Sequence, residues 1–404
     1  MKFRCRLSVF SPEVFGMPIK NTKIVCTIGP SSNEGNALIA MARAGMDLAR
    51  LNLAHGDYES HGKIIDMIRD VSKKIKRPIG IEIDLQGPKI RVGEIKDGGI
   101  LLKEGEKVTF STDPKIAKKI TGDLTKDKIF VQYENLHKDI EKGDRIMLAD
   151  GAMSAQVLEV EERDIICKVV DGGNLTARKG MNFPDTSISV PTITEKDKND
   201  LRFAIKRDVE WVGLSFVRSD KDIIELRELI ERYSHGKKPA TKITAKIETH
   251  EGLDNFDSIL EAADGIVVAR GDLGPEVSIT AVPEYQKMIT EKSLRALKPV
   301  IVATQMLYSM TKNPRPTRAE VSDVANAVFD HVDGIYLSDE TASGNFPVES
   351  VNVAREIILD AERSEYDNVD VPLVDENIDS SRDIAKLSIH AANVAKEVDA
   401  KAIV

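Results

Sequence analysis

The sequence of 404 residues has only three cysteines and no apolar run long enough to cross a membrane. Cys5, Cys26 and Cys167 are scattered and form no Cys-x-x-Cys pair, which argues against a disulfide framework and a cysteine zinc site and is typical of a reducing compartment. A membrane helix needs roughly 20 consecutive apolar residues, so we predict no membrane partner. Residues 1–16 lack the apolar core of a signal peptide, and we expect a cytoplasmic protein with a loose N-terminal extension over 1–16.

Positive charge is also in deficit, because 57 Lys and Arg against 66 Asp and Glu give a net charge of −9. General nucleic-acid binding needs a positive surface, so we expect no nucleic-acid partner. Net charge governs solubility and long-range steering rather than the chemistry of one pocket, so the negative net charge does not exclude an anionic substrate. With 41% hydrophobic and 30% charged residues the chain is typical of a globular protein, and its length predicts two or three domains of roughly 100–200 residues.

Short β-branched apolar runs alternate with longer segments of helical periodicity, which is the pattern of a parallel α/β fold. Ser219 and Thr317 each stand where a helix should begin, and Glu320 completes a capping box with Thr317. Eight strand–helix units predict a (β/α)₈ TIM barrel with its active site at the carboxyl ends of the strands. The predicted strands are 23–28, 47–53, 79–85, 211–216, 242–247, 265–269, 299–303 and 334–337.

One connection of the predicted barrel is far longer than a loop. Between Gly87 and Pro184 the helical periodicity is lost, and short alternating strands are separated by turns at 141–144, 162–164 and 171–174. We interpret residues 88–184 as an inserted all-β, barrel-like domain, because a structureless loop of that length is implausible in a compact protein. The barrel then comprises 17–87 and 185–358, and residues 359–404 begin a C-terminal α/β domain that is incomplete in this chain.

Polar residues follow the predicted strands at every strand end, which is unusual for a rim that serves only as scaffold. Glu248 and Asp272 offer the hard oxygen ligands that suit Mg²⁺, or Mn²⁺ in its place. Arg50 can direct two donors at a phosphate, and Lys246 adds a compact positive charge beside the metal. Taken alone, a Lys-x-Glu pair on a strand is more often a surface ion pair, so only the joint arrangement predicts a phosphate-handling metal site. The other polar residues at the strand ends are Thr27, Asn52, His55, Asp84, Arg91, Ser215, Arg218, Thr304, Gln305, Ser338 and Glu340.

Several specific motifs occur in order through residues 22–360. They are Cys26-Thr-Ile-Gly-Pro30, Arg50-Leu-Asn-Leu-Ala-His-Gly56, Asp84-Leu-Gln-Gly-Pro-Lys-Ile-Arg91, Ala245-Lys-Ile-Glu248, Val268-Ala-Arg-Gly-Asp-Leu-Gly274, Ala303-Thr-Gln-Met-Leu307, Pro314-Arg-Pro-Thr-Arg-Ala-Glu320 and Ser322-Asp-Val-Ala-Asn-Ala327. With these motifs the sequence closely resembles the pyruvate kinase family. The resemblance implies a barrel, an inserted lid and a C-terminal domain, with a homotetramer for the complete chain. The implied reaction is phosphoryl transfer from phosphoenolpyruvate to ADP, giving pyruvate and ATP.

The resemblance also implies roles for individual residues around the phosphoryl group. Lys246 would stabilise the phosphoryl group during its transfer, and Arg50 would bind the phosphate. Glu248 and Asp272 would bind Mg²⁺.

Further roles follow for the rest of the substrates. Thr304 and the backbone amides of Gly271 and Asp272 would hold the substrate carboxylate. Thr304 and Ser215, working through water, are the candidates for protonating the enolate. The residues implied to contact the nucleotide are Asn52, His55, Arg91 and Lys179.

The sequence departs from the family where many members bind a monovalent cation, in the region of Asn52 and Asp84. Those members have a serine and a threonine there and a glutamate in the Gly-Pro-x-Ile-Arg motif, whereas this chain has Ala54, Leu85 and Lys89. Ala54 removes a ligand oxygen, and Leu85 leaves only its backbone carbonyl. Since Lys89 brings an ammonium to this region, we predict that it replaces the cation and that activity does not require K⁺.

Two alternative functions are also compatible with parts of the sequence. Another Mg²⁺-dependent barrel enzyme acting on phosphoenolpyruvate or pyruvate, an aldolase or lyase, would need the same carboxylates and arginine, but it would not need Arg91 and Lys179. A catalytically inactive regulatory paralogue would have lost Lys246, Arg50 or a metal carboxylate, and all of them are present.

Overall fold

The computed structural model describes residues 20–54, 56–235 and 241–368, and in addition 13, 14, 17, 18, 390, 391 and 394. Most of the predicted extension over 1–16 and most of the predicted C-terminal segment 359–404 therefore lie outside the described residues. Strands β1 (Glu13–Val14) and β2 (Met17–Pro18) form a short antiparallel pair. Among the helices of the described part of the chain, none is long and apolar enough to cross a membrane.

Eight parallel strands close into a barrel, which confirms the predicted (β/α)₈ fold. Neighbouring strands pair in parallel around the ring, for example Leu214 with Leu85 and Ala269 with Ala303. Their Val- and Ile-rich sequences are buried, because helices cover the outside and side chains fill the inside. In ring order the strands are β14 (Trp211–Leu214), β15 (Lys242–Ile247), β16 (Gly265–Ala269), β17 (Val300–Ala303), β18 (Gly334–Leu337), β3 (Lys23–Thr27), β4 (Leu48–Asn52) and β5 (Gly80–Leu85).

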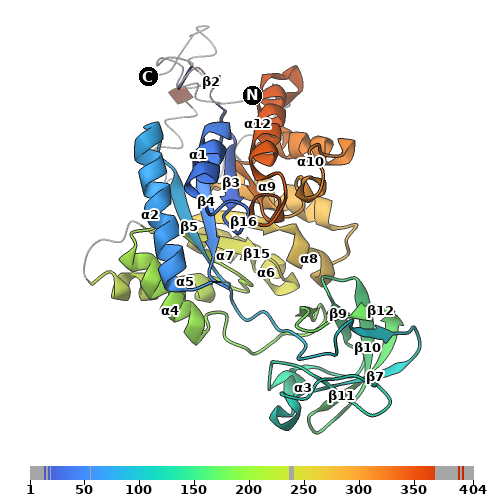
Figure 1. The fold of residues 1–404 in the computed structure, drawn as a ribbon. Coiled ribbons are helices and arrows are strands. Elements are labelled where there is room, and N and C mark those ends of the chain that lie inside the picture. The colour runs from blue at the N-terminus through green and yellow to red at the C-terminus, as the bar shows by residue number, and fades with distance from the viewer. Residues whose placement is uncertain are drawn as a thin grey trace.

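Helices surround this barrel in Figure 1. Helix α10 (Arg318–Phe329) begins at the predicted capping box, in which the Glu320 amide donates to Thr317 Oγ1 at 3.2 Å and the Thr317 amide donates to Glu320 Oε2 at 2.7 Å. Helix α5 (Asp220–Tyr233) begins directly after Ser219, also as predicted. The others are α1 (Gly35–Ala44), α2 (Tyr58–Ile75), α4 (Glu195–Lys206), α6 (His250–Asp254), α7 (Phe256–Ala262), α8 (Arg270–Glu276), α9 (Val282–Arg295), α11 (Asp339–Ala342) and α12 (Pro347–Arg363), with the 3₁₀ turns η2 (Tyr308–Thr311) and η3 (Glu365–Asn368).

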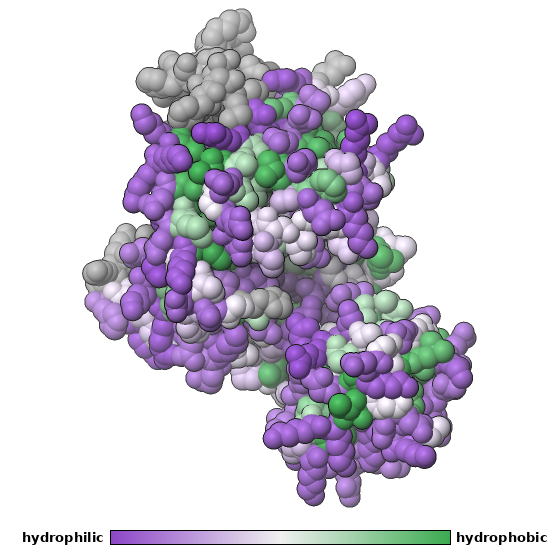
Figure 2. Space-filling view, viewed as in Figure 1, coloured by the Kyte–Doolittle hydropathy of each residue, from purple (hydrophilic) through white to green (hydrophobic). Residues whose placement is uncertain are grey.

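Between β5 and α4 the chain forms a second body, the lid, which contains β6 to β13 and has its own hydrophobic core. In Figure 1 it stands off from the barrel and is joined to it by two extended segments. The face shown in Figure 2 is largely hydrophilic on both bodies. A six-stranded sheet runs in the order β13-β9-β10-β11-β7-β8, and β12 pairs with β6. The lid elements are β6 (Ile100–Leu102), β7 (Lys107–Ser111), η1 (Pro114–Ile116), β8 (Ile129–Phe130), α3 (Leu136–Asp139), β9 (Arg145–Leu148), β10 (Met153–Glu161), β11 (Asp164–Asp171), β12 (Gly173–Leu175) and β13 (Met181–Asn182).

The predicted lid turns at 141–144 and 162–164 are present, but the turn predicted at 171–174 is wrong. There the chain continues from β11 through Gly172 into β12, which leaves the large sheet and pairs antiparallel with β6. A glycine pair therefore marks a change of partner strand here and not a reversal of the chain.

Alternate side chains of the barrel strands point into the barrel. An apolar layer of Val25, Val267, Ala303 and Tyr336 fills part of this interior and is separate from the main core between strands and helices. Toward the carboxyl ends of β4, β5 and β15, the inward positions are occupied by charged side chains, which form the candidate site.

Candidate active site

Lys246, near the carboxyl end of β15, lies at the centre of a buried cluster of charged side chains. Its Nζ atom lies 2.9 Å from Glu248 Oε1 and 3.5 Å from Asp84 Oδ1, and it donates to Ser215 Oγ at 2.8 Å. Burial would lower the pKa of Lys246, but the carboxylates of Asp84 and Glu248 outweigh it and raise that pKa above its ordinary value. The ammonium group is thus charged and held in a defined position.

Arg50, on β4, is held in place by Asp84 on the neighbouring strand β5. Arg50 Nε donates to Asp84 Oδ2 at 3.1 Å, Nη2 donates to the same oxygen, and Nη1 donates to Thr27 Oγ1 at 3.1 Å. Burial would raise the pKa of Asp84, but Arg50 and Lys246 hold it below its ordinary value. Asp84, which the family resemblance implies to lie in the monovalent-cation region, is thus a counter-ion shared by Arg50 and Lys246.

Glu248 and Asp272, the two predicted metal ligands, fit a divalent cation. Glu248 is 1% exposed, and its Oε2 accepts from the Phe216 amide at 2.6 Å. Burial raises the pKa of Glu248, the neighbouring Lys246 opposes this, and the negative charge of Asp272 adds to the rise. A cation between the two carboxylates would relieve that repulsion. The described residues hold no cluster of three or more acidic, histidine or cysteine side chains arranged for a metal, so substrate and water oxygens would complete the coordination.

Thr304 and Gly271 lie against each other at the ends of β17 and β16. A Cβ atom on Gly271 would lie 2.6 Å from Thr304 Cγ2, so glycine is required for this approach. Thr304 has a φ of +79°, which is rare for a β-branched residue, and its carbonyl accepts from Arg270 Nη2 at 2.7 Å. Arg270 is fixed in turn by Asp323 at 2.8 Å. The first turn of α8, which contains Gly271, therefore lies directly beside the Thr304 side chain.

The family model described as the barrel domain of pyruvate kinase matches residues 19–351. The chain belongs to the pyruvate kinase family. It is 46% identical over 349 residues to the pyruvate kinase of Bacillus licheniformis, covering 86% of this chain and 57% of the relative. The pyruvate kinase of Geobacillus stearothermophilus is 45% identical, with 85% and 57% covered, and that of Clostridium perfringens is 43% identical, with 96% and 80% covered.

This chain thus spans 57% of the length of the Bacillus and Geobacillus pyruvate kinases. The family assignment confirms the resemblance seen in the sequence motifs. Nothing in the matches favours the alternative of an aldolase or lyase.

Of the nucleotide contacts expected from the pyruvate kinase resemblance, Arg91 and Lys179 come together on the lid. The Val92 amide donates to the Lys179 carbonyl at 3.0 Å, and Arg91 forms a bridge with Gly180. Asn52 lies at the end of β4, where its Oδ1 accepts from the Ala54 amide at 2.9 Å. His55 lies outside the described residues.

Lys89, on the first segment between barrel and lid, contacts one of the two predicted metal ligands. Its Nζ donates to Asp272 Oδ1 at 2.7 Å and lies 4.0 Å from Asp150 Oδ1 of the lid. Leu85 is fully buried in the core between strands and helices. The sequence motif alone did not indicate the contact between Lys89 and Asp272, because the two residues are 183 positions apart.

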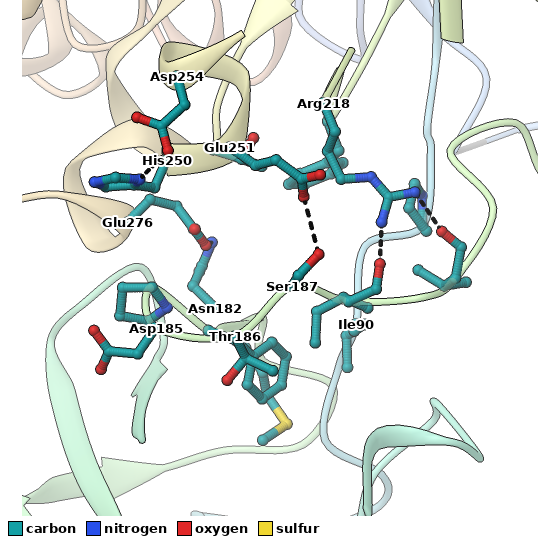
Figure 3. Close-up of a pocket in the computed structure, with 18 residues that line it drawn as sticks. Ile90, Asn182, Asp185, Thr186, Ser187, Arg218, His250, Glu251, Asp254 and Glu276 are labelled. Atoms are coloured by element: carbon teal, nitrogen blue, oxygen red, sulfur yellow. Dashed lines mark hydrogen bonds and ion pairs between the residues drawn. The ribbon is translucent and has the colours of Figure 1, made fainter. Parts of the chain in front are cut away.

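The second segment between lid and barrel borders a cavity of about 380 Å³, shown in Figure 3. Arg218 donates to the Val190 carbonyl at 2.6 Å and to Thr192 Oγ1 at 3.0 Å. Asn182 Nδ2 donates to Glu276 Oε1 at 2.9 Å. Arg218, predicted among the polar residues at the strand ends, therefore anchors the base of the lid.

Proposed function

We propose that the protein transfers the phosphoryl group of phosphoenolpyruvate to ADP, giving pyruvate and ATP in the last step of glycolysis. The observation that carries the proposal is the largely buried Lys246 ammonium, held 2.9 Å from Glu248 and 3.5 Å from Asp84 at the carboxyl end of a barrel that matches the pyruvate kinase model. Phosphoryl transfer depends mainly on positioning and on stabilising charge, and this cluster provides both.

In this proposal the residues act on separate parts of the substrate. A β-phosphate oxygen of ADP attacks the phosphorus, and the bond from phosphorus to the enol oxygen breaks. Arg50 binds the phosphate through its guanidinium donors. Lys246 offsets charge that spreads over the oxygens of the transferring group. Glu248 and Asp272 would hold Mg²⁺, or Mn²⁺, which when bound supplies further charge neutralisation on the phosphate oxygens.

The enolate left by this transfer takes up a proton at its methylene carbon. We propose Ser215 or Thr304, acting through water, as the source. Ser215 Oγ already accepts a hydrogen bond from Lys246, so its hydroxyl proton can point elsewhere. The substrate carboxylate would be held by the Thr304 hydroxyl and the amides of Gly271 and Asp272.

The close packing of Gly271 and Thr304 makes the carboxylate site testable. Gly271→Ala should displace Thr304 and raise the KM for phosphoenolpyruvate about tenfold, because small misplacements in a binding site are costly. Steady-state kinetics with each substrate varied in turn measure this effect. Gly274→Ala on the same helix is the control, since its Cβ would meet nothing nearer than Val282 Cγ2 at 4.0 Å. Equal KM values for the two variants would contradict the assignment.

We further propose that Lys89 makes activity independent of K⁺. The contact of its Nζ with Asp272 at 2.7 Å supports this proposal, because it places the Lys89 side chain inside the site. The unsubstituted chain should turn over comparably with and without K⁺, measured in buffers that lack Na⁺ and K⁺. Lys89→Glu should lower K⁺-free turnover about tenfold or more, with partial recovery in K⁺.

The same change in charge at the exposed lid residue Lys103 is the control for Lys89→Glu and should leave turnover unaltered. Strong activation of the unsubstituted chain by added K⁺ would contradict the role of Lys89.

Asn52, His55, Arg91 and Lys179 remain the proposed nucleotide contacts, with the lid closing over ADP. We also propose a homotetramer for the complete chain and a cytoplasmic location, both of which rest on the family and on the sequence.

Formation of ATP from phosphoenolpyruvate and ADP, dependent on Mg²⁺, is the direct test of the proposed function. The folded chain is added to phosphoenolpyruvate and ADP with and without Mg²⁺, and the ATP formed is measured with luciferase. A folded chain that forms no ATP from these substrates would contradict the proposal.

A further inference from the structure

Glu82, a buried acidic residue inside the barrel, takes no part in the proposed chemistry. It is 1% exposed and lies on β5, two residues before Asp84 and on the same inward face. Thr244 Oγ1, from β15, donates to Glu82 Oε1 at 2.5 Å, and Tyr336 Oη, from β18, donates to Glu82 Oε2. One carboxylate thus connects three strands across the interior.

A carboxylate at this position is costly for the fold. Burial, together with the charge of Asp84, raises the pKa of Glu82, which shows that the charged form is disfavoured there. The apolar layer beside it contains Val25, Val267 and Ala303, so an apolar side chain would suit the surroundings. The contacts of Glu82 therefore indicate a role other than stabilising the fold.

Tyr336 is the link between Glu82 and the candidate site. Its ring lies under the guanidinium of Arg50, with Arg50 Cζ 5.5 Å from the ring centroid, and the side chain is 4% exposed. Because its hydroxyl is bonded to Glu82, the ring cannot slide away from Arg50. A cation over an aromatic face is attracted by the ring quadrupole, and this attraction is stronger where water is excluded.

Gly213, on β14, makes room for this arrangement. A Cβ atom at Gly213 would lie 2.9 Å from Asp84 Oδ1 and 3.2 Å from Glu82 Oε1. The two carboxylates of β5 are therefore packed against bare backbone, and a side chain on Gly213 would displace them. Arg50 is held at its edge by Asp84 and at its face by Tyr336.

We propose that Glu82 and Tyr336 are positioning residues that fix the Arg50 guanidinium for binding the substrate phosphate. The inference rests on the proposed function, in which Arg50 binds the phosphate of phosphoenolpyruvate. Neither residue touches substrate: Tyr336 acts on Arg50, and Glu82 acts on Tyr336.

Kinetics and calorimetry of substituted chains test the inference. Tyr336→Leu and Glu82→Ala should each raise the KM for phosphoenolpyruvate about tenfold while leaving the KM for ADP within about twofold. Glu82→Gln, whose amide can still bond both hydroxyl groups, should restore a KM near that of the unsubstituted chain. Tyr336→Phe keeps the ring and the fold but frees it from Glu82, and it should raise the KM for phosphoenolpyruvate about threefold.

Val267→Ala is the matched control, because it truncates a side chain of the same interior layer without touching Arg50. If it raises the KM for phosphoenolpyruvate as much as Tyr336→Leu, general loosening of the barrel is responsible and the inference is wrong. An unchanged KM for phosphoenolpyruvate in both Tyr336 variants would overturn it as well.

Titration calorimetry with phosphoenolpyruvate and Mg²⁺, without ADP, separates this inference from the proposed function. A chain that binds phosphoenolpyruvate but forms no ATP contradicts the proposed function alone, and weaker binding by Tyr336→Leu would still support the inference. A chain that does not bind phosphoenolpyruvate at all contradicts both.

Discussion

Replacing Lys246 with methionine should lower kcat for ATP formation by about 10³-fold. The methionine keeps most of the volume of the side chain but removes the charge that faces the transferring phosphoryl group. It also leaves Glu248 and Asp84 without the ammonium that lies 2.9 Å and 3.5 Å from them, so their repulsion toward a phosphate increases. Coupled spectrophotometric measurement of pyruvate release, with Mg²⁺ saturating, gives kcat directly.

Lys242→Met is the matched control for this loss of charge. Lys242 lies on the same strand β15 at its opposite end, where its Nζ lies over the ring of Trp211, 5.5 Å from the ring centroid. Its substitution should leave kcat within about twofold. Undiminished turnover in Lys246→Met, with Lys242→Met behaving like the unsubstituted chain, would remove Lys246 from the mechanism.

Asp84→Asn should lower the free energy of unfolding of the barrel by about 3 kcal/mol, the largest stability effect that we expect from a single change. Asp84 has a side chain only 5% exposed and is the acceptor for two donors of Arg50. An amide of the same shape cannot balance the charges of Arg50 and Lys246, which would remain buried. Breaking such a pair is costly even where the pair itself contributes little net stability.

Urea unfolding followed by tryptophan fluorescence measures this change in the barrel alone, because the single tryptophan of the chain, Trp211, lies on β14. Asp66→Asn removes the carboxylate from an exposed pair with Arg207, where the Asp66 side chain is 65% exposed. It should cost less than about 1 kcal/mol. Equal losses in the two variants would show that burial of the Asp84 pair is unimportant.

The effect of Asp84→Asn should also depend on pH. The folded protein holds the pKa of Asp84 below its ordinary value of 3.8, so the stabilisation is fully present above that value. It is lost as the pH falls through the lower pKa of the folded state. The contribution of the Asp84 charge to the difference in unfolding free energy between the two chains should therefore shrink as the pH falls below 3.8.

The barrel could be predicted from sequence because its strands are short β-branched runs of regular spacing. The runs predicted at 242–247, 265–269 and 334–337 coincide with β15, β16 and β18, and the capping box at Thr317 begins α10 as predicted. Strand ends were less accurate, since β14 ends at Leu214 and not at 216. Phe216 adopts a φ of +55° there, and its amide turns toward Glu248.

The contacts within the site could be predicted only in part. Parallel strands bring their carboxyl ends together, so Arg50, Lys246 and Glu248 were expected to converge. Which of these side chains touch depends on how the strands are staggered in the closed barrel, and the sequence does not show this stagger. The contact of Lys89 with Asp272 and the position of Tyr336 under Arg50 were therefore found only in the structure. Glu82 was overlooked because it is a single acidic residue within an apolar run, although its spacing of two from Asp84 places both on one face.

The lid leaves the barrel after β5 and returns at the start of α4, so it interrupts a single βα connection. Strand β5 still pairs with β14 in register, with Asp84 opposite Gly213 and Leu85 opposite Leu214. Among the residues that the structure describes, no strand, helix or strand pairing of the barrel is shared with the inserted body. The two parts therefore have separate strand pairing and meet through side chains, such as Lys89 on Asp272 and Asn182 on Glu276. A lid exchanged at this one connection would have to keep these contacts to leave the geometry of the site unchanged.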